Sequence, residues 1–446
     1  MRIRRAFTAV LVALACIATA CGDEKSAPEA PGAKPAPAAA PDPAREPSTA
    51  PAAASIPATP DSLPNGLVLA LAQFVKTEGT PVPGPARLEF VYRKDGKWQT
   101  SSAEDDQSNV FHKAFYYEGS AGPRLMTLAG TAATVKTWEA TDAGLEPTTE
   151  WEKDFGGKWS RMRDAEVADL YGDGAAAVAV ATHDQGVVAV LRPKAAGGFD
   201  VVQLDEKPDT FVHEIEIGDV DGDGVLEVYA TPSDPNRMDG TRQHGQVVRY
   251  VPKDGEGRVV VADLGDRHAK EILVDDVDGD GRDELYVSVE GHLEGEGAAK
   301  RLVDPVEIRR YDADTPADAG IVIGRLKDSL SRFLTAGDVD GDGKKELVVA
   351  AFSSGLWLFR PGDDPKGSWQ RELIDRDSAG FEHAAILSDL DGDGVDELYV
   401  ASDRHKELRR YVWNGSKLVR EVIYTRPEDR SIFTWNLMPV PVEIIP

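Results

Sequence analysis

Four segments of the sequence place carboxylates at alternating positions between glycines. Each reads Asp-x-Asp-Gly-Asp-Gly-x-x-Glu, and the segments begin at Asp219, Asp276, Asp338 and Asp389. Acidic side chains at positions 1, 3, 5 and 9, with a main-chain carbonyl at position 7, offer the hard oxygen atoms that calcium prefers as ligands. Glycine at positions 4 and 6 permits the sharp turn that lets the carboxylates converge. The pattern therefore predicts about four bound Ca²⁺ ions.

The carboxylates of one such loop repel one another unless a cation lies among them. Two charges about 4 Å apart repel by roughly 1 kcal/mol in water, and by more where solvent is partly excluded. A single polar turn rich in Asp and Gly needs no metal, whereas four copies that share Glu at position 9 favour metal binding. An EF-hand is excluded because it needs an acid at position 12, where these loops have Ala230, Val287, Val349 and Val400. We find no base beside the loops that could activate metal-bound water, so we expect structural ions in a protein that is not an enzyme.

The spacing of the loops predicts the elements that position them. A fifth segment, beginning at Asp169, keeps the frame but has Tyr171 at position 3 and Ala177 at position 9. First-position Asp residues follow one another at intervals of 50, 57, 62 and 51 residues, a period typical of propellers and solenoids. Short runs with the β pattern flank each loop, as at 215–217 and 227–230, and no helical period appears between the loops.

A second β-hairpin follows the loop-bearing hairpin in every unit. We expect seven such second hairpins, at roughly residues 87–100, 134–151, 187–204, 246–264, 306–326, 356–374 and 407–424. Six first hairpins begin near Phe111, Arg163, His213, Lys270, Arg332 and His383. The missing one is expected from the end of the chain, where runs at 432–435 and 442–445 would join residues 87–100. The prediction is an all-β, seven-bladed β-propeller of four-stranded blades over residues 65–446, closed by N- and C-terminal strands, with six or eight blades left open.

The first 21 residues have the pattern of a secretion signal. Three arginines within the first five residues precede an apolar run, residues 6–20, that is too short to span a membrane. The run ends Ala-Thr-Ala-Cys21, which resembles the bacterial lipoprotein box and implies lipidation of Cys21; an ordinary cleaved signal is the alternative. Residues 22–64, rich in Ala and Pro, cannot bury enough apolar surface to fold and are expected to form a disordered linker. These features predict an exported protein of the bacterial cell envelope, held to the membrane by a lipid anchor.

Charge and cysteine content exclude several classes of function. With 50 basic and 77 acidic residues, the chain of 446 residues carries a formal charge of −27, which argues against a nucleic-acid partner. Four Ca²⁺ ions would contribute +8 and leave −19. The two cysteines are Cys16 and Cys21, so the predicted propeller has no disulfide, no thiolate metal site and no cysteine nucleophile.

The repeated motif, followed by an apolar strand, resembles the FG-GAP/VCBS-type repeat of calcium-binding β-propellers, the family that includes the integrin α-subunit head. The resemblance covers about residues 105–425 and is specific at four loops. It implies that each loop joins the two inner strands of a blade on the lower face. It also implies four sets of ligands: Asp219, Asp221, Asp223 and Glu227; Asp276, Asp278, Asp280 and Glu284; Asp338, Asp340, Asp342 and Glu346; Asp389, Asp391, Asp393 and Glu397. Glu stands at position 9 where integrins usually have Asp, and clear Phe-Gly and Gly-Ala-Pro elements are absent, which disfavours integrin-style partner recognition.

A basic residue recurs six positions before the first Asp of each loop. These residues are Arg163, His213, Lys270, Arg332 and His383, with His112 nearly in frame in the first unit. In a propeller this position begins the innermost strand, so the bases would form a ring at the channel mouth opposite the loops and could bind an anionic sugar, a carboxylate or an acidic peptide. The alternative is that each base pairs with a neighbouring acid, such as Asp164, Glu214, Glu271 or Glu382, and only fastens adjacent blades.

These observations together predict a ligand-binding, adhesion or scaffold module whose partner is a carbohydrate or an envelope protein. One alternative is a polysaccharide-active enzyme, a lyase or hydrolase, because propellers with similar repeats occur in such proteins. Another is a passive subunit of an envelope complex.

Overall fold

The computed structural model describes residues 57–446 except 78–79, 120–121, 131–132, 156–159, 184, 236–241, 296–299, 379–383 and 428–430. The described residues all belong to one compact unit, residues 57–446. The predicted signal peptide, Cys21 and most of the predicted linker therefore lie outside the described residues, as does His383. The described residues contain no helix that is long and apolar enough to cross a membrane.

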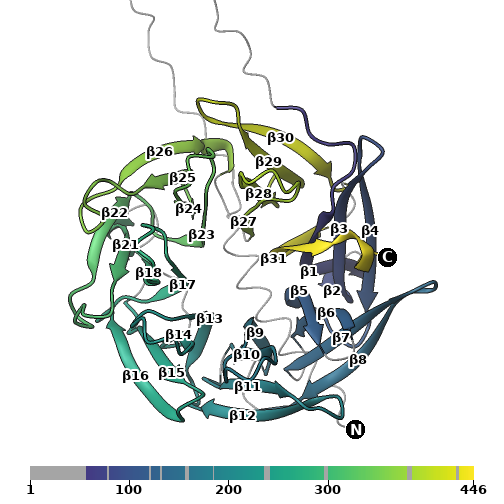
Figure 1. The fold of residues 1–446 in the computed structure, drawn as a ribbon, viewed down its shortest axis with the longest axis horizontal. Coiled ribbons are helices and arrows are strands. Elements are labelled where there is room, and N and C mark those ends of the chain that lie inside the picture. Colours follow the sequence, from purple (N-terminus) through teal and green to yellow (C-terminus); the bar gives the residue numbers. More distant parts are fainter. Residues whose placement is uncertain are drawn as a thin grey trace, which may run out of the picture. The chain divides into compact units, whose positions relative to one another are not determined.

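Residues 65–446 form seven antiparallel sheets arranged around a central channel (Figure 1). Blade 1 contains β5 (Phe111–Gly119), β6 (Gly122–Ala129), β7 (Thr134–Thr141) and β8 (Gly144–Glu152). Blade 2 contains β9 (Met162–Ala168), β10 (Ala177–Thr182), β11 (Val188–Pro193) and β12 (Phe199–Asp205). Blade 3 contains β13 (Phe211–Gly218), β14 (Glu227–Ser233), β15 (Gln246–Val251) and β16 (Glu256–Asp263).

Blade 4 contains β17 (Ala269–Asp275), β18 (Glu284–Val289), β21 (Val306–Tyr311) and β22 (Ile321–Leu326). Blade 5 contains β23 (Ser331–Gly337), β24 (Glu346–Ala351), β25 (Gly355–Arg360) and β26 (Gln370–Asp375), followed by the 3₁₀ helix η2 (Arg376–Ser378). Blade 6 contains β27 (Ala385–Ser388), β28 (Glu397–Ser402), β29 (Glu407–Trp413) and β30 (Leu418–Thr425). In blades 1 to 6 the strands are paired in chain order, with the first at the channel and the last at the rim (Figure 1). The predicted seven-bladed propeller is confirmed.

Blade 7 closes the ring with strands from both ends of the described chain. Its order is β31 (Ser431–Pro441), β1 (Asn65–Thr77), β3 (Ala86–Lys94) and β4 (Lys97–Asp105). The prediction that residues 431–446 supply both missing strands is wrong in detail. Only β31 comes from that segment, because Val442–Ile444 forms the 3₁₀ helix η3, and the second strand is β1. A nearly continuous apolar run at 67–71 makes β1 suitable for a strand covered on both faces.

The hydrophobic core lies between the blades. In blades 2 to 6 the second strands are buried along their whole length, as in β10, because a neighbouring blade covers each face. One cluster joins Ala179 and Val190 of blade 2 to Ile215, Val228 and others of blade 3. Outermost strands such as β12 are largely exposed. Each blade is therefore stabilised mainly by its neighbours, and the ring behaves as one packed unit.

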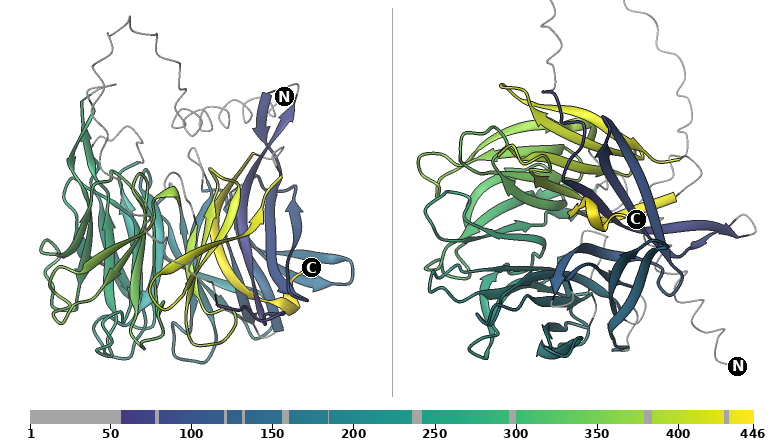
Figure 2. Two further views of the ribbon diagram at one scale, coloured as in Figure 1. Left: turned by 90° about the horizontal axis from the view of Figure 1, so that it is seen from above. Right: turned by 45° about the vertical axis from the view of Figure 1, so that its right-hand side comes forward.

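The two faces of the ring differ in their connections. We call the face where the acidic loops join first to second strands the lower face, and the opposite one the upper face. Two hairpins project from the upper face (Figure 2): the end of β1 with β2 (Thr80–Pro83), and β19 (His292–Glu294) with β20 (Arg301–Asp304). Thr59, Pro60 and Leu63, near the end of the predicted linker, already contact the propeller.

Candidate functional site

The first Asp of each acidic loop holds the turn together through main-chain amides. In the loop that begins at Asp276, its Oδ1 accepts hydrogen bonds from the amides of Gly279 (2.8 Å) and Asp280 (3.0 Å), and its Oδ2 accepts one from Gly281 (2.9 Å). Gly279 and Gly281 have φ of 75° and 90°, a region that strains other residues. The loops at 219, 338 and 389 repeat these bonds to the amides at positions 5 and 6.

The turn brings the predicted metal ligands together to different extents. Within each group, one ligand oxygen per residue lies within 4.8 Å of the others, and the groups are Asp276, Asp278, Asp280 and Glu284; Asp219, Asp221 and Asp223; Asp338, Asp340 and Glu346; Asp389, Asp391 and Asp393. Glu227, Asp342 and Glu397 are the predicted ligands outside these groups. The position-9 glutamates are 2–4% exposed, whereas the position-5 aspartates are exposed.

An arginine from the third strand of the same blade bridges positions 3 and 9 in all four loops. Its distances to the Asp and the Glu are 3.2 and 2.7 Å for Arg249, 2.5 and 3.1 Å for Arg310, and 2.8 and 2.5 Å for Arg360. Arg410 contacts Glu397 and lies 3.8 Å from Asp391. Sequence analysis missed these residues, because the distance from the loop to the third strand varies with the intervening hairpin.

The residues present fit a calcium ion. In two loops, the Oδ2 atom of the position-3 aspartate faces the arginine, whereas its Oδ1 atom is buried without a hydrogen-bond partner. The two residues are Asp340 and Asp391. A buried carboxylate oxygen without a partner is costly, and a cation among the clustered oxygens would satisfy it. Burial raises the pKa of Glu284 and of Glu346 to about 7 in spite of the adjacent arginines.

The fifth loop has the same turn without the ligand cluster. Asp169 accepts hydrogen bonds from the amides of Asp173 and Gly174 at 3.0 and 2.8 Å. Arg192, from the third strand, contacts Asp173 at 2.6 Å and lies 4.3 Å from the ring centre of Tyr171. Tyr171 and Ala177 occupy positions 3 and 9 in place of the acids, so this loop keeps its arginine but has two fewer carboxylates.

At the upper end of the channel, the inner strands share a β-bulge. Pairing with the second strand shifts by one residue in each described blade except blade 6. The inner-strand residues at these shifts are His112, Arg163, His213, Lys270, Arg332 and Trp435, which we call the bulge ring. A bulge turns a side chain away from the regular alternation of a strand. Four of the five predicted ring residues belong to it, and His383 lies outside the described residues.

Members of the bulge ring contact one another and their neighbours. The rings of His112 and Trp435 are 5.1 Å apart, and Arg163 lies 5.7 Å from the centre of the Trp435 ring. The rings of His183 and His213 are 5.4 Å apart. Sequence analysis did not place Trp435 here. This tryptophan stands six residues before the end of the last strand, and no acidic loop follows it to mark its position as in the other blades.

Burial and neighbouring charge both act on the bulge ring. Burial, followed by the charges of nearby cations, holds the pKa of His112 and of His213 well below the usual range, so both are neutral at pH 7. Burial and the Arg332 guanidinium lower the pKa of Lys270 to about 8. The positive charge of the ring is therefore carried by Arg163, Lys270 and Arg332.

Carboxylates lie next to this charge inside the channel. Lys113 pairs with Asp164 at 3.0 Å. Burial and neighbouring carboxylates raise the pKa of Glu214 well above its usual value. Glu271 and Glu290 lie close enough to Arg332 that its charge opposes the rise in their pKa caused by burial. Arg163 also acts on Glu271, and its charge opposes the rise in the pKa of that carboxyl more than the charge of Arg332 does. These carboxylates offset part of the ring's charge, as the blade-fastening alternative requires.

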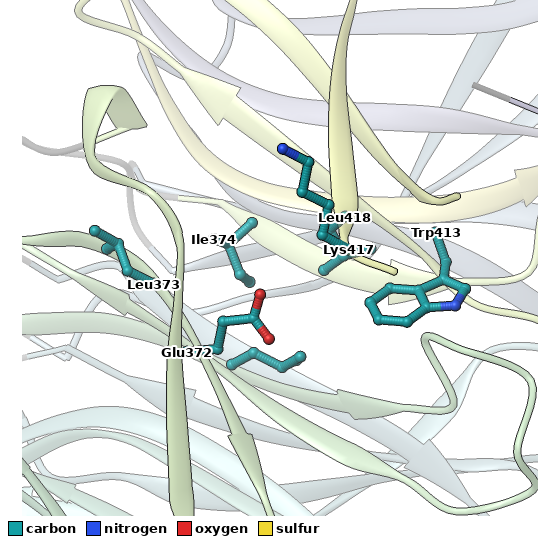
Figure 3. Close-up of a pocket in the computed structure, with 7 residues that line it drawn as sticks. Glu372, Leu373, Ile374, Trp413, Lys417 and Leu418 are labelled. Carbon is teal, nitrogen blue, oxygen red and sulfur yellow. The ribbon is translucent and has the colours of Figure 1, made fainter. Parts of the chain in front are cut away.

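Two hollows lie away from the channel. The one in Figure 3 has a volume of about 40 Å³ and is lined by residues that include Glu372, Trp413 and Lys417. The other, about 260 Å³, lies beside Arg249 and Tyr311. Sites for small ligands usually measure about 300–1,000 Å³, so both are small for a sugar.

Comparisons with known proteins agree with this architecture. Residues 338–400 match the FG-GAP-like repeat family, and no curated protein matches the chain. Among solved structures, an Agrocybe aegerita lectin that specifically recognises non-reducing terminal N-acetylglucosamine is 14% identical, with a TM-score of 0.52; the match covers 85% of this chain and 96% of the lectin. The periplasmic gluconolactonase PpgL of Pseudomonas aeruginosa is also 14% identical, with a TM-score of 0.46 and coverage of 82% and 98%.

The identity to the lectin is low, so its similarity supports the fold alone. The family match, from Asp338 to Val400, covers two of the four complete acidic loops, those that begin at Asp338 and Asp389. These loops share their sequence pattern and their turn with the other two around the same ring. The chain is therefore a seven-bladed β-propeller that contains an FG-GAP-like repeat at residues 338–400.

Proposed function

We propose that this propeller is a calcium-stabilised binding module, exported to the bacterial cell envelope and held there by a lipid on Cys21, that takes an acidic carbohydrate at the upper mouth of its channel. The observation that carries the binding role is the bulge ring. Blades that differ in length place a base or an aromatic residue at the same bulge, which regular strand pairing does not require.

Calcium would be held on the lower face by the acids at positions 1, 3, 5 and 9 of four loops. The ion would supply positive charge that links the two inner strands of a blade. Support comes from the clustered carboxylate oxygens and from the buried, unpartnered Oδ1 atoms of Asp340 and Asp391.

A thermal melt tests the metal. The Cys21→Ser chain, which cannot be lipidated, should melt at higher temperature in millimolar calcium than in chelator, because an ion that binds the folded state stabilises it by mass action. Asp338→Ala should reduce the number of bound ions by one, measured by calorimetric titration. A melting temperature that does not respond to chelator at neutral pH would contradict the proposal.

The ligand would be an anion recognised from several blades. Arg163, Lys270 and Arg332 carry positive charge on blades 2, 4 and 5. The neutral imidazole of His213, whose Nε2 has no hydrogen-bond partner among the described residues, can donate one hydrogen bond to a carboxylate. His112 cannot, because its one N–H is given to the carbonyl oxygen of Met162. An acidic glycan combines carboxylates with a sugar ring that can pack beside Trp435. An acidic segment of an envelope protein has the same charge and is the second candidate.

Binding of the calcium-loaded Cys21→Ser chain to neutral and acidic glycans tests this role. Saturable binding to acidic glycans that the double variant Lys270→Ala, Arg332→Ala weakens at least about tenfold, or 1.4 kcal/mol, would support it. A matched control is Lys97→Ala, Arg371→Ala, two cations on outer strands far from the channel. Unchanged affinity of the first double variant would overturn the assignment to the ring.

Product analysis in the same experiment distinguishes binding from catalysis. Release of shortened sugar would make the protein a polysaccharide-active enzyme, and the adjacent neutral imidazoles of His183 and His213 would be the first candidates for a base. No binding to any glycan would direct the search to a protein partner through cross-linking in the envelope.

Lipid anchoring has its own test. The chain with Cys21 should partition with membranes and incorporate labelled fatty acid, whereas the Cys21→Ser chain should be released as soluble protein. Equal behaviour of the two chains would show that the cysteine is not lipidated.

A further inference from the structure

Each acidic loop already contains a cation supplied by its own blade. The guanidinium groups of Arg249, Arg310 and Arg360 lie within 3.2 Å of both the position-3 aspartate and the position-9 glutamate. Arg410 has the same two partners at a looser distance from Asp391. Two of the four carboxylates that would hold calcium are therefore partly neutralised before any ion binds.

The arginine approaches by one of two routes that depend on position 11. Where Tyr229, Tyr286 or Tyr399 occupies it, the tyrosine hydroxyl donates to the position-9 glutamate and the arginine lies opposite the tyrosine in the sheet. Where the residue is Val348, the arginine is Arg360, beyond Phe359, which pairs with Leu347. Both routes bring the guanidinium to the same pair of acids. The contact between arginine and acids is therefore kept even where the arginine occupies a different position in the strand pairing.

The fifth loop shows what remains when calcium ligands are replaced. Tyr171 and Ala177 remove two carboxylates, yet Arg192 is still present and stacks on Tyr171 while it pairs with Asp173. The turn has the same hydrogen bonds as the acidic loops. In this loop the hydrogen bonds to Asp169 close the turn, and the third-strand arginine contacts it although two of the metal ligands are replaced.

We propose that the third-strand arginine is a resident counter-ion, which keeps each acidic loop closed in the absence of calcium and weakens calcium binding by competing for the carboxylates at positions 3 and 9. The affinity of a calcium site with oxygen ligands depends on the net charge of those ligands. Each arginine reduces the negative charge of its loop from −4 to −3. The four sites then exchange calcium without opening the propeller. This inference rests on the proposed calcium binding.

The loop at 276 offers the sharpest test, because all four of its acids cluster and Arg310 is almost fully buried against them. Arg310→Met keeps an unbranched apolar stem, although a shorter one, and removes the charge and the hydrogen-bond donors. In chelator this variant should melt at lower temperature than the parent Cys21→Ser chain. Its calcium isotherm should show the parent number of sites, with one site several-fold tighter, and the rise in Tm produced by calcium should be larger than in the parent.

Three variants keep the test decisive. Arg310→Lys retains the charge but loses the two-pronged bridge, so its calcium affinity should stay close to the parent value. Arg192→Met should lower Tm by a similar amount in chelator and in calcium, and leave the isotherm unchanged. Arg360→Met, where the arginine is a quarter exposed, repeats the experiment if Arg310→Met fails to fold.

The results distinguish calcium binding itself from the proposed role of the arginines. No calcium response in the parent chain would overturn the calcium proposal itself. A parent response with equal or weaker calcium binding in Arg310→Met and Arg360→Met would leave calcium binding intact and show that the arginines only position the ligands.

Discussion

At the scale of single residues, the environment of Glu214 makes the stability of the folded chain depend on pH. It lies in the channel beside Asp164, and burial with the neighbouring carboxylates raises its pKa well above the ordinary 4.5. A group with a raised folded-state pKa contributes its full stability below the ordinary value, and loses it as pH rises through the folded pKa. Unprotonated Glu214 therefore destabilises the folded chain at alkaline pH.

We expect Glu214→Gln to raise Tm at pH 8 by a few degrees and to leave it nearly unchanged at pH 5. The amide cannot ionise, and its NH₂ group can donate to Asp164 as the protonated acid does. Melts across this pH range give the result, with Glu146→Gln, at an exposed site in β8, as the control that should change neither value. If the variant instead has a lower Tm than the parent at pH 8, ionised Glu214 stabilises the folded chain at that pH.

At the scale of elements, adjacent blades are joined where one loop approaches the next. Asp396, at position 8 of the loop at 389, accepts a hydrogen bond from the amide of Asp338 at 2.9 Å. A Cβ at Gly337 would lie 2.5 Å from the same carboxylate. Asp283 bears the same relation to Asp219 and Gly218. The glycine on one blade leaves the space that the aspartate of the next blade needs to form its hydrogen bond.

We expect Gly337→Ala to destabilise the chain by about 1–3 kcal/mol, because the added methyl group displaces Asp396 from its hydrogen bond. Chemical denaturation in calcium measures the effect. Gly257→Ala is the matched control, since no atom lies within 4 Å of its Cβ position. If the two variants unfold at the same denaturant concentration, the close approach between blades 5 and 6 contributes nothing.

For the molecule as a whole, stability depends on closing the ring. β31 pairs with β1 along ten residue pairs and with them completes blade 7. Without β31, the inner faces of the neighbouring blades lose a partner, and apolar residues such as Leu69 and Leu71, now buried, become accessible.

We expect deletion of residues 431–446 to abolish cooperative unfolding, whereas removal of the exposed Pro446 alone should leave Tm unchanged. Calorimetry and analytical gel filtration distinguish a folded ring from an aggregated or open one. A truncated chain that still melts in one sharp transition near the parent Tm would show that the other six blades are stable without closure.

Much of the fold is readable in the sequence because its signals are local. The loop at Asp276 specifies its own turn: carboxylate oxygens cap nearby amides, and glycines supply the left-handed conformations. Recurrence of that turn every 50 to 62 residues reveals the repeating unit, and the second hairpins between the turns extend the count to seven. The strand β1 was missed because it has no turn motif beside it, and the closing pair joins Asn65 to Pro441, which no local pattern connects.

The sequence alone determined the propeller architecture, the acidic turns and the recurrence of a basic residue six positions before them, since each depends on a short stretch of chain. Only the tertiary structure decided that those basic residues stand at β-bulges, that Trp435 completes their ring, and that an arginine from the third strand reaches positions 3 and 9 of each loop. These relations join residues on different strands, and their geometry follows from strand pairing and blade packing, which bring together parts of the chain whose separation in sequence varies from blade to blade.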